Sequence, residues 1–468
     1  MSLFASLTTA VSGLNAQSSA IGNISDDIAN AQTVGFKGID TSFENLVTES
    51  TSTFNEPGGV IAQPVYQNQL AGSLVQSSTS TSLAISGQGF FQVKAPPSTA
   101  AGTTSATDFA ASNYYTRRGD FTVNNEGYLV NGAGYYLEGY NVNPQTDVVN
   151  NATGSAAPIQ VTQLQDNPVP STTATLVANL PSSSEVQGVD AGYTSPAPVT
   201  TEVYDALGNT HQASIQFNHI GPNTSATPAI AANTWSASIT LAGSTTPAAT
   251  FNLTFGDGTQ TYAALGGTGT QVPAAGTLAS IVETTTPPEA TVPTATTTGA
   301  SADITIPYTI GSASQPLTFN LGQFGADTGL TQFADTQVNV NSFTANGIAR
   351  GSFQSVSIDD NGNVALNYSN GQSLTYFQIP IAQFNAPDQL QNLNGSAFSA
   401  TQASGAAQLS SANANGAGSI SASELEQSNV DIASQFTNLI TAQNVYSANS
   451  KVITTDNQLL QTIINIIQ

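Results

Sequence analysis

Apolar residues follow a heptad spacing at both ends of the chain. Steps of three and four from the N-terminus put one stripe on Leu3, Leu7, Ala10, Leu14, Gln17, Ile21, Ile24, Ile28 and Ala31. Steps of seven near the C-terminus give Ile432, Leu439, Tyr446, Ile453, Leu460 and Ile467, with a second stripe beside them at Val445, Val452, Leu459 and Ile466. This spacing is typical of helices that pack along a seam. Because no proline precedes Pro57 or follows Pro387, the pattern predicts one long helix at each terminus.

The two terminal stripes are wider than one partner helix can cover, and two interpretations follow. In the first, the helices form a core hairpin of a globular domain, as in ordinary bundles. In the second, copies of the same subunit cover the surplus apolar surface. A head-to-tail contact of that kind, repeated without closure, builds a helical filament.

Between the ends, apolar and polar residues alternate with a period of two, which predicts β-strands. The clearest segments are residues 81–93, 114–140, 201–217 and 352–384. Turn signals such as Asn131-Gly132 and Asn370-Gly371 separate them, because Asn-Gly favours the left-handed backbone angles of tight hairpins. We therefore interpret the whole middle of the chain as β-structure.

The predicted fold class is multidomain, with α-helical coiled-coil termini and mainly β central domains in a nested, discontinuous order. The arrangement comprises a helical inner-core domain (1–30 with 428–468), a connecting segment (31–75 with 406–427), a β domain (76–150 with 341–405) and an outer β domain (151–340) with room for an extra subdomain. The Thr- and Pro-rich tract at 284–302 lacks the aromatic residues of a core, so we interpret it as a solvated loop or an interdomain linker.

Charge and composition narrow the possible functions. The chain of 468 residues has 6 Lys and Arg against 29 Asp and Glu, a net charge of −23, so nucleic acid and anionic membrane surfaces would repel it. No stretch approaches the ~18 consecutive apolar residues of a membrane span, and the N-terminus lacks the pattern of a cleavable signal. We expect a protein that is cytoplasmic or is exported with its N-terminus intact. The absence of cysteine would let an unfolded chain pass through a narrow channel.

Candidate catalytic and ligand-binding residues are few. His211 and His219 have no cysteine and only Asp205 nearby, so we interpret them as surface or packing residues. The DDNGN run at 359–363 lacks the glutamate of a calcium loop and predicts a hairpin turn. The sequence therefore predicts no catalytic, metal or cofactor site.

The rare basic residues also need partners. Arg117 and Arg118 form the only basic pair and could clamp a ligand carboxylate, although pairing with Asp120 or with acidic groups of a neighbouring subunit is the simpler expectation. Lys37 is the only Lys or Arg before Lys94. It therefore has little competition for a local acidic partner, and we expect it to anchor the segment around it.

That segment, ANAQTVGFKG at 29–38, should end the first helix. Thr33 and Val34 are β-branched and disfavour helix, and Gly35 can adopt positive φ. NISDDIANAQTVGFKG, residues 23–38, resembles the N-terminal signature of the bacterial flagellar axial family, which includes rod and hook subunits.

The resemblance extends to other parts of the chain. Residues 428–467 are similar to the matching end of that family, 83–91 and 116–140 resemble its first β domain, and 404–432 resemble its hook members. Rod subunits lack a large central insert, whereas this chain has one. The resemblance thus favours a hook subunit, with a distal-rod subunit as the alternative.

A hook subunit would be a structural protein of the bacterial flagellum, not an enzyme. The resemblance implies a homopolymer that forms a curved extracellular tube and acts as a universal joint passing motor torque to the filament, exported without a cleaved signal. It implies the distal rod, the hook cap and the hook-filament junction proteins as partners, with no cofactor, no nucleic acid and no membrane insertion.

In this family the terminal helices pack together around the central channel. The resemblance therefore implies assembly roles for Leu3, Leu7, Leu14, Ile21, Ile24, Ile28, Ile432, Phe436, Leu439, Tyr446, Ile453, Leu460 and Ile467. It also implies an elbow between the helices and the β domains, made of Thr33, Val34, Gly35, Phe36 and Lys37.

Two other classes of function compete. A secreted, β-rich adhesin would share the Thr- and Asn-rich composition, but it would need a cleavable signal or an anchor and would not need matched heptads at both ends. A polysaccharide-active enzyme would need paired carboxylates in a cleft. Asp359 and Asp360 are adjacent in a predicted turn, so their side chains should point apart.

Overall fold

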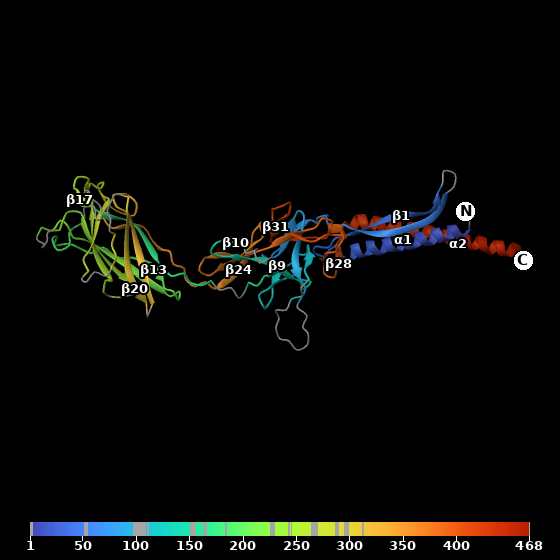
Figure 1. Cartoon of the computed structure of the whole chain (residues 1–468), viewed down its shortest axis with the longest axis horizontal. Coiled ribbons are helices and arrows are strands. Elements are labelled where there is room, and N and C mark those ends of the chain that lie inside the picture. The colour runs from blue at the N-terminus through green and yellow to red at the C-terminus, as the bar shows by residue number, and fades with distance from the viewer. Residues whose placement is uncertain are drawn as a thin grey trace, which may run out of the picture. The chain divides into compact units, whose positions relative to one another are not determined.

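The computed structural model describes residues 3–50, 55–96, 109, 112–149, 156–161, 166–182, 185–224, 230–241, 244, 246–263, 270–285, 290–293, 299–310 and 313–467. The chain folds into two compact units (Figure 1). The first unit combines Met1–Leu164 with Phe353–Gln468, and the second unit is Gln165–Ser352. A long helix near each end and β-sheets between them confirm the predicted fold class.

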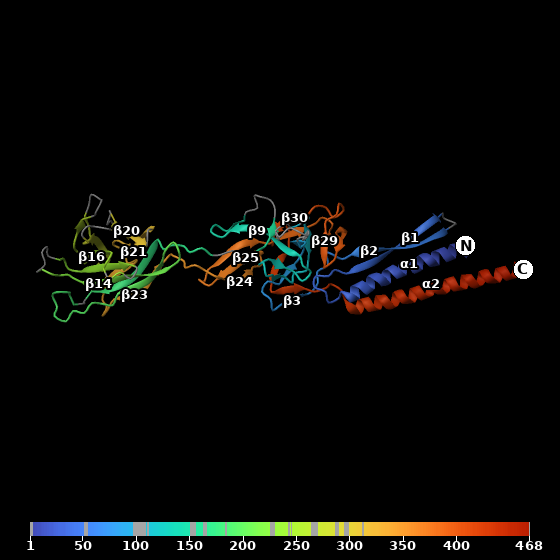
Figure 2. The same ribbon diagram turned by 90° about the horizontal axis from the view of Figure 1, so that it is seen from below.

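The two helices of the first unit are α1 (Leu3–Ala29) and α2 (Ile432–Ile467). They lie side by side and antiparallel, as Figures 1 and 2 show. Ser6 near the start of α1 donates a hydrogen bond to Asp456 near the end of α2, with 2.7 Å between Oγ and Oδ2. At the other end of the pair, Gln435 of α2 donates to Asp27 of α1. The expectation of one long helix at each terminus is confirmed.

A long antiparallel hairpin of β1 (Ile39–Ser50) and β2 (Asn55–Tyr66) follows α1 and packs along it. Two polar contacts fix its position. The Val60 N–H donates to Ser12 Oγ at 3.1 Å, and Asn23 Nδ2 donates to Thr41 Oγ1 at 3.0 Å. The helix α1 is therefore covered by the hairpin on one side and by α2 on another.

The β part of the first unit is built from strands of both halves of the sequence. Its main sheet runs in the order β24 (Phe353–Ile358), β25 (Asn363–Tyr368), β26 (Ser373–Gln378), β9 (Tyr136–Asn143), β5 (Phe90–Lys94), β6 (Tyr114–Thr116), β29 (Ala397–Ser399) and β28 (Gln391–Leu393). Joined to it are β7 (Thr122–Val123), β8 (Leu129–Val130), β10 (Val148–Val149), β11 (Ala157–Pro158), β27 (Pro380–Gln383) and β30 (Gln408–Ser411). Two smaller pairs are β3 (Leu74–Gln76) with β32 (Glu424–Glu426), and β4 (Leu83–Ser86) with β31 (Ser419–Ala422).

The core of this part likewise combines early and late residues. Phe91 and Leu137 pack in one buried cluster with Val364, Ile379 and Ile420. Neither half of the sequence can therefore complete this core alone. The predicted turn at residues 359–363 joins β24 to β25, where Asp359 Oδ1 accepts hydrogen bonds from the N–H groups of Asn361 and Asn363.

The second unit is made of two packed sheets and a short hairpin. One sheet has the order β20 (Ser301–Ile310), β21 (Ala313–Gln323), β12 (Thr173–Pro181) and β22 (Leu330–Phe333), with β23 (Asn339–Ala345) also paired to β12. The other has the order β13 (Val199–Tyr204), β14 (Thr210–His219), β15 (Thr234–Leu241), β16 (Ala249–Phe255) and β19 (Leu278–Glu283). The hairpin is β17 (Tyr262–Ala263) with β18 (Thr270–Gln271).

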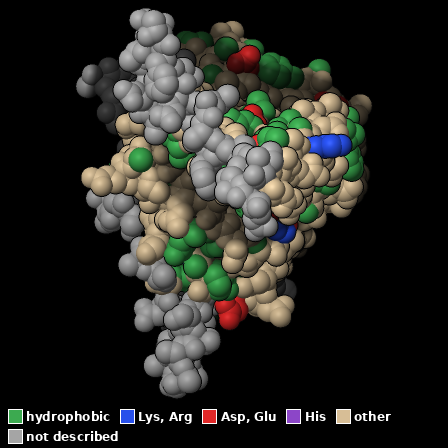
Figure 3. All heavy atoms as spheres, turned by 90° about the vertical axis from the view of Figure 1, so that its right-hand side faces the viewer, with side chains coloured by type: hydrophobic (Ala, Val, Ile, Leu, Met, Phe, Trp, Pro, Cys, Tyr) green, Lys and Arg blue, Asp and Glu red, His purple; other side chains and the backbone are tan. Residues whose placement is uncertain are grey.

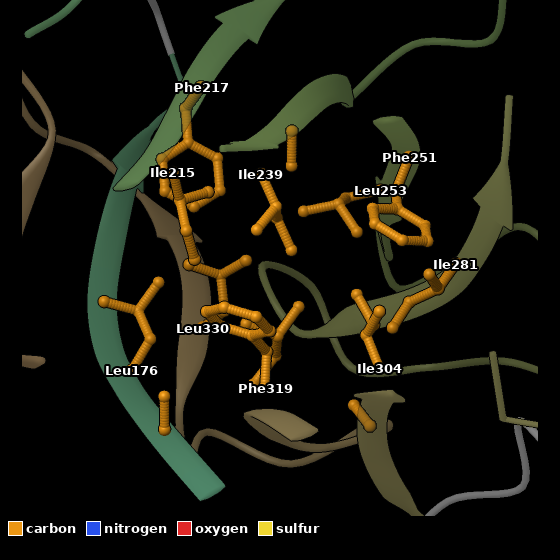
Figure 4. Packing of buried hydrophobic residues seen from close by; sticks show 14 of the residues in the cluster. Leu176, Ile215, Phe217, Ile239, Phe251, Leu253, Ile281, Ile304, Phe319 and Leu330 are labelled. Atoms are coloured by element: carbon orange, nitrogen blue, oxygen red, sulfur yellow. The ribbon is translucent and has the colours of Figure 1, made fainter. Parts of the chain in front are cut away.

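Alternate residues of these strands face one shared core. In β16, for example, buried and partly buried positions alternate along the whole strand, as expected for a strand that packs on one face only. Figure 4 shows Phe217 and Phe251 from one sheet and Phe319 and Leu330 from the other pointing into the same interior. The two faces interdigitate in the manner of a β-sandwich.

The structure corrects one interpretation of the Thr- and Pro-rich tract at 284–302. The tract connects β19 to β20 inside the second unit, so it is not a linker between domains. Thr291 pairs with Thr305 in an isolated bridge, and Ala302 is fully buried in the core. Residues 286–289 and 294–298 lie outside the described residues. The composition of the tract gave the wrong prediction because a strand, here β20, can begin in a segment that has no aromatic residue.

The two cores should unfold separately. Phe251, which is fully buried, belongs to the cluster of the second unit, and Phe121 belongs to the cluster of the first. Phe251→Ala should lower the stability of the second unit by ~3–5 kcal/mol and leave the unfolding of the first unit in place. Phe121→Ala should do the reverse. Calorimetry of the two variants measures this, and a shift of every transition by either substitution would contradict it.

Candidate assembly surface

Small residues recur at the buried positions of α1, and Gly13 among them lies at the contact with α2. Along α1 the buried positions are Ala10, Gly13, Ala16, Ala20, Ile24 and Asp27, which recur every three or four residues. At Gly13 an added Cβ would lie 2.7 Å from Nδ2 of Asn449 on α2, so a larger residue would require the Asn449 side chain to move. Small side chains let the two backbones approach closely. The helix pair is therefore held by a narrow seam.

The large apolar residues predicted for assembly divide between that seam and the surface. Of the α1 set, Ile24 is buried, and Leu7, Leu14, Ile21 and Ile28 are partly buried. Of the α2 set, Leu439, Ile453 and Leu460 are partly buried, whereas Ile432, Phe436 and Tyr446 are exposed. The side chains of Leu3 and Ile467 lie outside the described residues. The structure thus brings the two sets together only in part, and their roles in assembly stay a prediction.

A second line of apolar residues on α2 stays exposed beside the contact with α1. It consists of Val445, Val452 and Leu459, spaced one heptad apart and 39%, 44% and 48% exposed, and we call it the α2 stripe. Figure 3 looks onto the end of the first unit where α1 begins and α2 ends, and shows green hydrophobic side chains among tan backbone and other side chains, with few charged groups. Sequence periodicity predicted this stripe.

The β1–β2 hairpin adds exposed apolar residues next to the helices. Phe43, Leu46, Ile61 and Val65 are each 45% exposed. The strand register puts Leu46, Ile61 and Val65 on one face of the hairpin, which we call the hairpin patch, and Phe43 on the other face. A groove of about 350 Å³ is lined by Phe43 together with Val445 of the α2 stripe and Ala20 of α1. The α2 stripe, the groove and the hairpin patch together form the candidate assembly surface.

The predicted elbow lies where α1 leads into this hairpin. Gly35 has a φ of 67°, and a Cβ added to it would lie 2.6 Å from the backbone nitrogen of Arg118. Its N–H donates to the carbonyl oxygen of Glu426 at 2.8 Å. Thr33 donates its hydroxyl to Asn30 Oδ1 in the turn that follows α1. Val34 and Phe36 are partly buried beside it.

The side chain of Lys37, the last elbow residue, is buried in a cluster of charges. Its Nζ donates to Glu426 Oε1 at 2.5 Å and to the Leu70 carbonyl oxygen at 2.7 Å. Arg117 Nη1 donates to Glu426 Oε2 at 3.2 Å, and Nη2 donates to the Gly87 carbonyl oxygen at 2.7 Å. We call Lys37, Arg117 and Glu426 the buried charge cluster. One carboxylate thus joins the elbow, the first β domain and the strand that precedes α2.

Burial of these charges has an electrostatic cost. It lowers the pKa of Lys37 and of Arg117 from their usual values, and the nearby Glu426 carboxylate opposes the shift in both. The side chain of Glu426 is fully buried, and those of Lys37 and Arg117 are 1% exposed. The three charges are therefore stable in the interior only while they remain together.

The sequence analysis was wrong about the partner of Arg117 and correct about Arg118. Arg118 pairs with Asp120 through Nε at 2.9 Å and Nη2 at 2.8 Å, as expected, but Arg117 pairs with Glu426 of the same chain. Glu426 is 389 positions from Lys37, so it is not a local partner of Lys37 either. The available signal was indirect. A buried basic side chain needs a carboxylate partner, but the sequence does not show which carboxylate that is.

Asp27 makes a second polar connection at the elbow. Its Oδ1 accepts the Ile39 N–H at 2.9 Å, and its Oδ2 accepts Gln435 Nε2 at 2.9 Å, so it joins the end of α1 to the start of β1 and to α2. Only 1% of the residue is exposed. Burial raises the pKa of Asp27 to about 6, with smaller contributions from Asp26 and Asp40, while the Ile39 N–H opposes the rise.

This shift predicts a pH dependence for the first unit. The Asp27 carboxyl binds its proton more tightly in the folded chain (pKa about 6) than at its ordinary value of 3.8. Its contribution to stability should therefore rise as the pH falls from about 6 to about 4, and should be lost as the pH rises through about 6. Asp27→Asn keeps an acceptor for Ile39 and should remove this slope. Urea unfolding of the first unit across that pH range, with Asp26→Asn as the control, measures the difference, and an unchanged slope in Asp27→Asn would contradict it.

The two histidines have partners within the second unit. His211 contacts Asp205 with 3.1 Å between Nε2 and Oδ2, and His219 is buried and stacks on Trp235 with 4.8 Å between ring centroids. Both are surface or packing residues, as predicted. Within the described ranges, no three His, Cys, Asp or Glu side chains are grouped so that they could hold a metal ion. No helix in the described part of the chain is long and apolar enough to cross a membrane.

Comparison with known proteins places four family models along the chain. The Flagella basal body rod protein model matches residues 7–37, and the Flagellar hook protein FlgE/F/G D1 domain matches 84–164. The Flagellar basal body protein FlaE D2 domain matches 189–348, and the Flagellar basal body rod FlgEFG protein C-terminal model matches 422–466. The helices, the first β domain and the second unit are each similar to one of these models.

Two relatives that match over nearly their whole length are flagellar hook proteins. The flagellar hook protein FlgE of Brucella abortus is 29% identical over 469 residues, covering 100% of both chains. FlgE of Escherichia coli is 28% identical over 476 residues, covering 98% of both chains. The crystal structure of Helicobacter pylori flagellar hook protein FlgE2 has a TM-score of 0.42 at 14% identity, covering 74% of this chain and 98% of that chain.

Proposed function

The chain belongs to the flagellar rod and hook family and is a structural subunit of the flagellar hook, and we propose that it polymerises through the candidate assembly surface into a curved tube. The relatives that match along their whole length are hook proteins. These matches favour a hook subunit over a distal-rod subunit and over a secreted adhesin. They also favour a structural protein over a polysaccharide-active enzyme. The hook is an extracellular part of the flagellum.

One observation carries the proposal of polymerisation. The α2 stripe and the hairpin patch are two apolar surfaces that remain exposed within the described part of the chain. Exposed apolar surface of this kind marks a protein interface, and further copies of the same chain are the partner that a hook supplies. The stripe and the patch are different surfaces, so a contact between them on two copies is head-to-tail. Such contacts continue into a helical array unless the rotation closes a ring.

The predicted domain order gives this tube its layers. We propose that residues 1–30 with 428–468 form the inner layer around the channel, and that 76–150 with 341–405 and then 151–340 form the outer layers. Residues 31–75 with 406–427 connect them, and the elbow lies at the boundary. The buried charge cluster supports this assignment, because it fixes the elbow to the β domain by contacts that solvent cannot reach.

A universal joint also needs outer surfaces that slide. A curved tube can rotate about its own axis only if each subunit repeatedly shortens and lengthens its contacts with its neighbours. With only 7% charged residues, the chain has few salt bridges that could lock one register. Many weak polar contacts can exchange at little cost in free energy. We propose that the apolar helices hold the tube together while the Ser-, Thr- and Asn-rich β surfaces slide.

The remaining partners are part of the same proposal. A tube of this kind contacts the distal rod at one end, and the hook cap and then the hook-filament junction proteins at the other. Export without a cleaved signal fits a chain without cysteine, because no disulfide would stop an unfolded chain in a narrow channel.

Electron microscopy tests the proposal directly. Purified full-length chain, concentrated stepwise, should form curved tubes of constant diameter. A chain that ends before Ile432 lacks α2 and should remain monomeric with both β units folded, which circular dichroism and limited proteolysis can check. Tubes formed by the truncated chain, or closed dimers as the only product of the full chain, would refute assembly through this surface.

A further inference from the structure

A lysine, an asparagine and a glutamate meet at the end of β5, away from the assembly surface. β5 lies between β9 and β6 in the main sheet of the first unit. Lys94, its last residue, pairs with Tyr136 of β9, and Val93 pairs with Tyr114 of β6. The residue before Tyr114 is Asn113, so it continues the β6 register opposite Lys94. Glu138 is two residues after Tyr136, and therefore lies diagonally across from Lys94 on the same face of the sheet.

The side chains make the contacts that this register allows. Lys94 Nζ donates hydrogen bonds to Asn113 Oδ1 and, at 3.4 Å, to the Ser112 carbonyl oxygen. It forms an ion pair with Glu138, with 4.0 Å between Nζ and Oε1. The amine thus lies between the carboxamide of one neighbouring strand and the carboxylate of the other.

The glutamate is in an unusual environment for a carboxylate. Its side chain is fully buried, and Gln92 Nε2 donates to its Oε2 at 2.7 Å. Oε1, the oxygen that faces Lys94, accepts no hydrogen bond within the described part of the chain. Burial raises the pKa of Glu138, while the hydrogen bond from Gln92 and the charge of Lys94 oppose the rise. A carboxyl group held in hydrogen-bond reach of an amine and an amide can accept a proton from one and pass it to the other.

We propose that Lys94 and Asn113 join spontaneously in an intramolecular amide bond, with Glu138 relaying the protons. Glu138 takes one proton from the Lys94 ammonium group, and the free amine attacks Cγ of Asn113. The Nζ–Cγ bond forms, and the Cγ–Nδ2 bond breaks. Nδ2 leaves with the two protons that Nζ loses, both passed through Glu138, so the products are a secondary amide and one ammonium ion. Glu138 ends as a carboxylate, and no oxidant or reductant is consumed.

General chemistry supports each part of this reaction. Groups held in contact react with effective concentrations of ~10⁵–10⁸ M when their geometry suits the reaction, which compensates for the low reactivity of an amide. A lysine amine becomes a nucleophile when a neighbouring group removes its proton. The bond would join two adjacent strands in a chain that has no cysteine for a disulfide. Tension between β5 and β6 would then act on a covalent link.

Mass spectrometry of the purified full-length chain tests the proposal. The intact mass should be lower than the sequence mass by one ammonia molecule. Trypsin cannot cleave after an acylated lysine, so digestion of the denatured chain should give residues 38–117 as one peptide in place of 38–94 and 95–117. Cleavage after Lys37, which contacts a carboxylate and a backbone carbonyl, is the internal control.

Three variants separate the bond from other modifications. Asn113→Asp should lose water in place of ammonia, Lys94→Arg should keep its full mass, and Glu138→Gln should fold but lose most of the bond. Full mass and complete cleavage after Lys94 in the unsubstituted chain would overturn the proposal. Loss of ammonia with cleavage after Lys94 retained would also overturn it, because it would indicate cyclisation of an asparagine without a bond to Lys94. If the same fraction of Glu138→Gln chains carried the bond, Glu138 would have no part in the reaction.

Discussion

Val452→Asp should abolish tube formation and leave the monomer folded. Val452 is at the middle of the α2 stripe and is 44% exposed, so in the isolated chain the aspartate stays in water. In the proposed tube a second copy covers the stripe, and the new carboxylate would be buried without a partner. A buried, unpaired charge costs ~3–5 kcal/mol. Because each 1.4 kcal/mol corresponds to about a tenfold change in an equilibrium constant, the concentration needed for assembly should rise more than about 100-fold.

The matched control is Thr454→Asp, which adds the same charge to an exposed position of α2 away from the stripe. It should assemble at nearly the concentration of the unsubstituted chain. Sedimentation of the polymer across a concentration series gives the threshold, and electron microscopy shows the product. Equal thresholds for the two variants would exclude the α2 stripe from the interface. Circular dichroism of the monomers should show both helices intact.

Glu426→Gln should be the most destabilising single substitution in the first unit. It removes the carboxylate that pairs with both Lys37 and Arg117, and the two cations remain buried beside each other. Removing one partner from a buried ion pair costs ~3–5 kcal/mol, and here two partners are left unpaired. Denaturant unfolding of the first unit should show this loss. Asp120→Asn is the control, because Asp120 pairs with Arg118 near the surface and such a pair contributes only ~0–1 kcal/mol.

A loss below ~1 kcal/mol in Glu426→Gln, similar to that of Asp120→Asn, would contradict the assignment of the cluster as the fixed point of the elbow. The double variant Lys37→Met with Glu426→Gln refines the test. It removes a cation together with the carboxylate, so it should recover part of the lost stability. Recovery of that kind identifies the cost as unpaired charge.

Local signals were enough to predict the two helices and one turn. The terminal helices follow from heptad spacing without proline, although α1 ends at Ala29, before the Thr33 and Gly35 that were expected to end it. Gly35 has the positive φ that a glycine at this place suggested. The turn at Asp359 follows from the Asp and Asn-Gly residues within it. These features depend on neighbours in the sequence, whereas the close approach of Arg118 to Gly35 does not, and the role of the elbow stays a prediction.

Contacts between distant residues could not be predicted in this way. Nothing local to Lys37 or Arg117 indicates Glu426, which reaches them only through the pairing of β3 with β32. The seam at Gly13 and Ala16 was missed because large apolar residues dominate the heptad count, although small ones allow the closest approach of two helices. The sheet order that brings Lys94, Asn113 and Glu138 together depends likewise on long-range pairing.

The nested order of the chain has a consequence in time. β9 pairs with β26 and β5 pairs with β27, so the main sheet of the first unit needs strands from before residue 164 and after residue 353. A chain that emerges from a channel one end first cannot complete this sheet until nearly all of it has passed, whichever end leads. The second unit is continuous in sequence and can fold as soon as it has emerged. In a subunit exported through such a channel, the core of the first unit is therefore completed only after the second unit has folded.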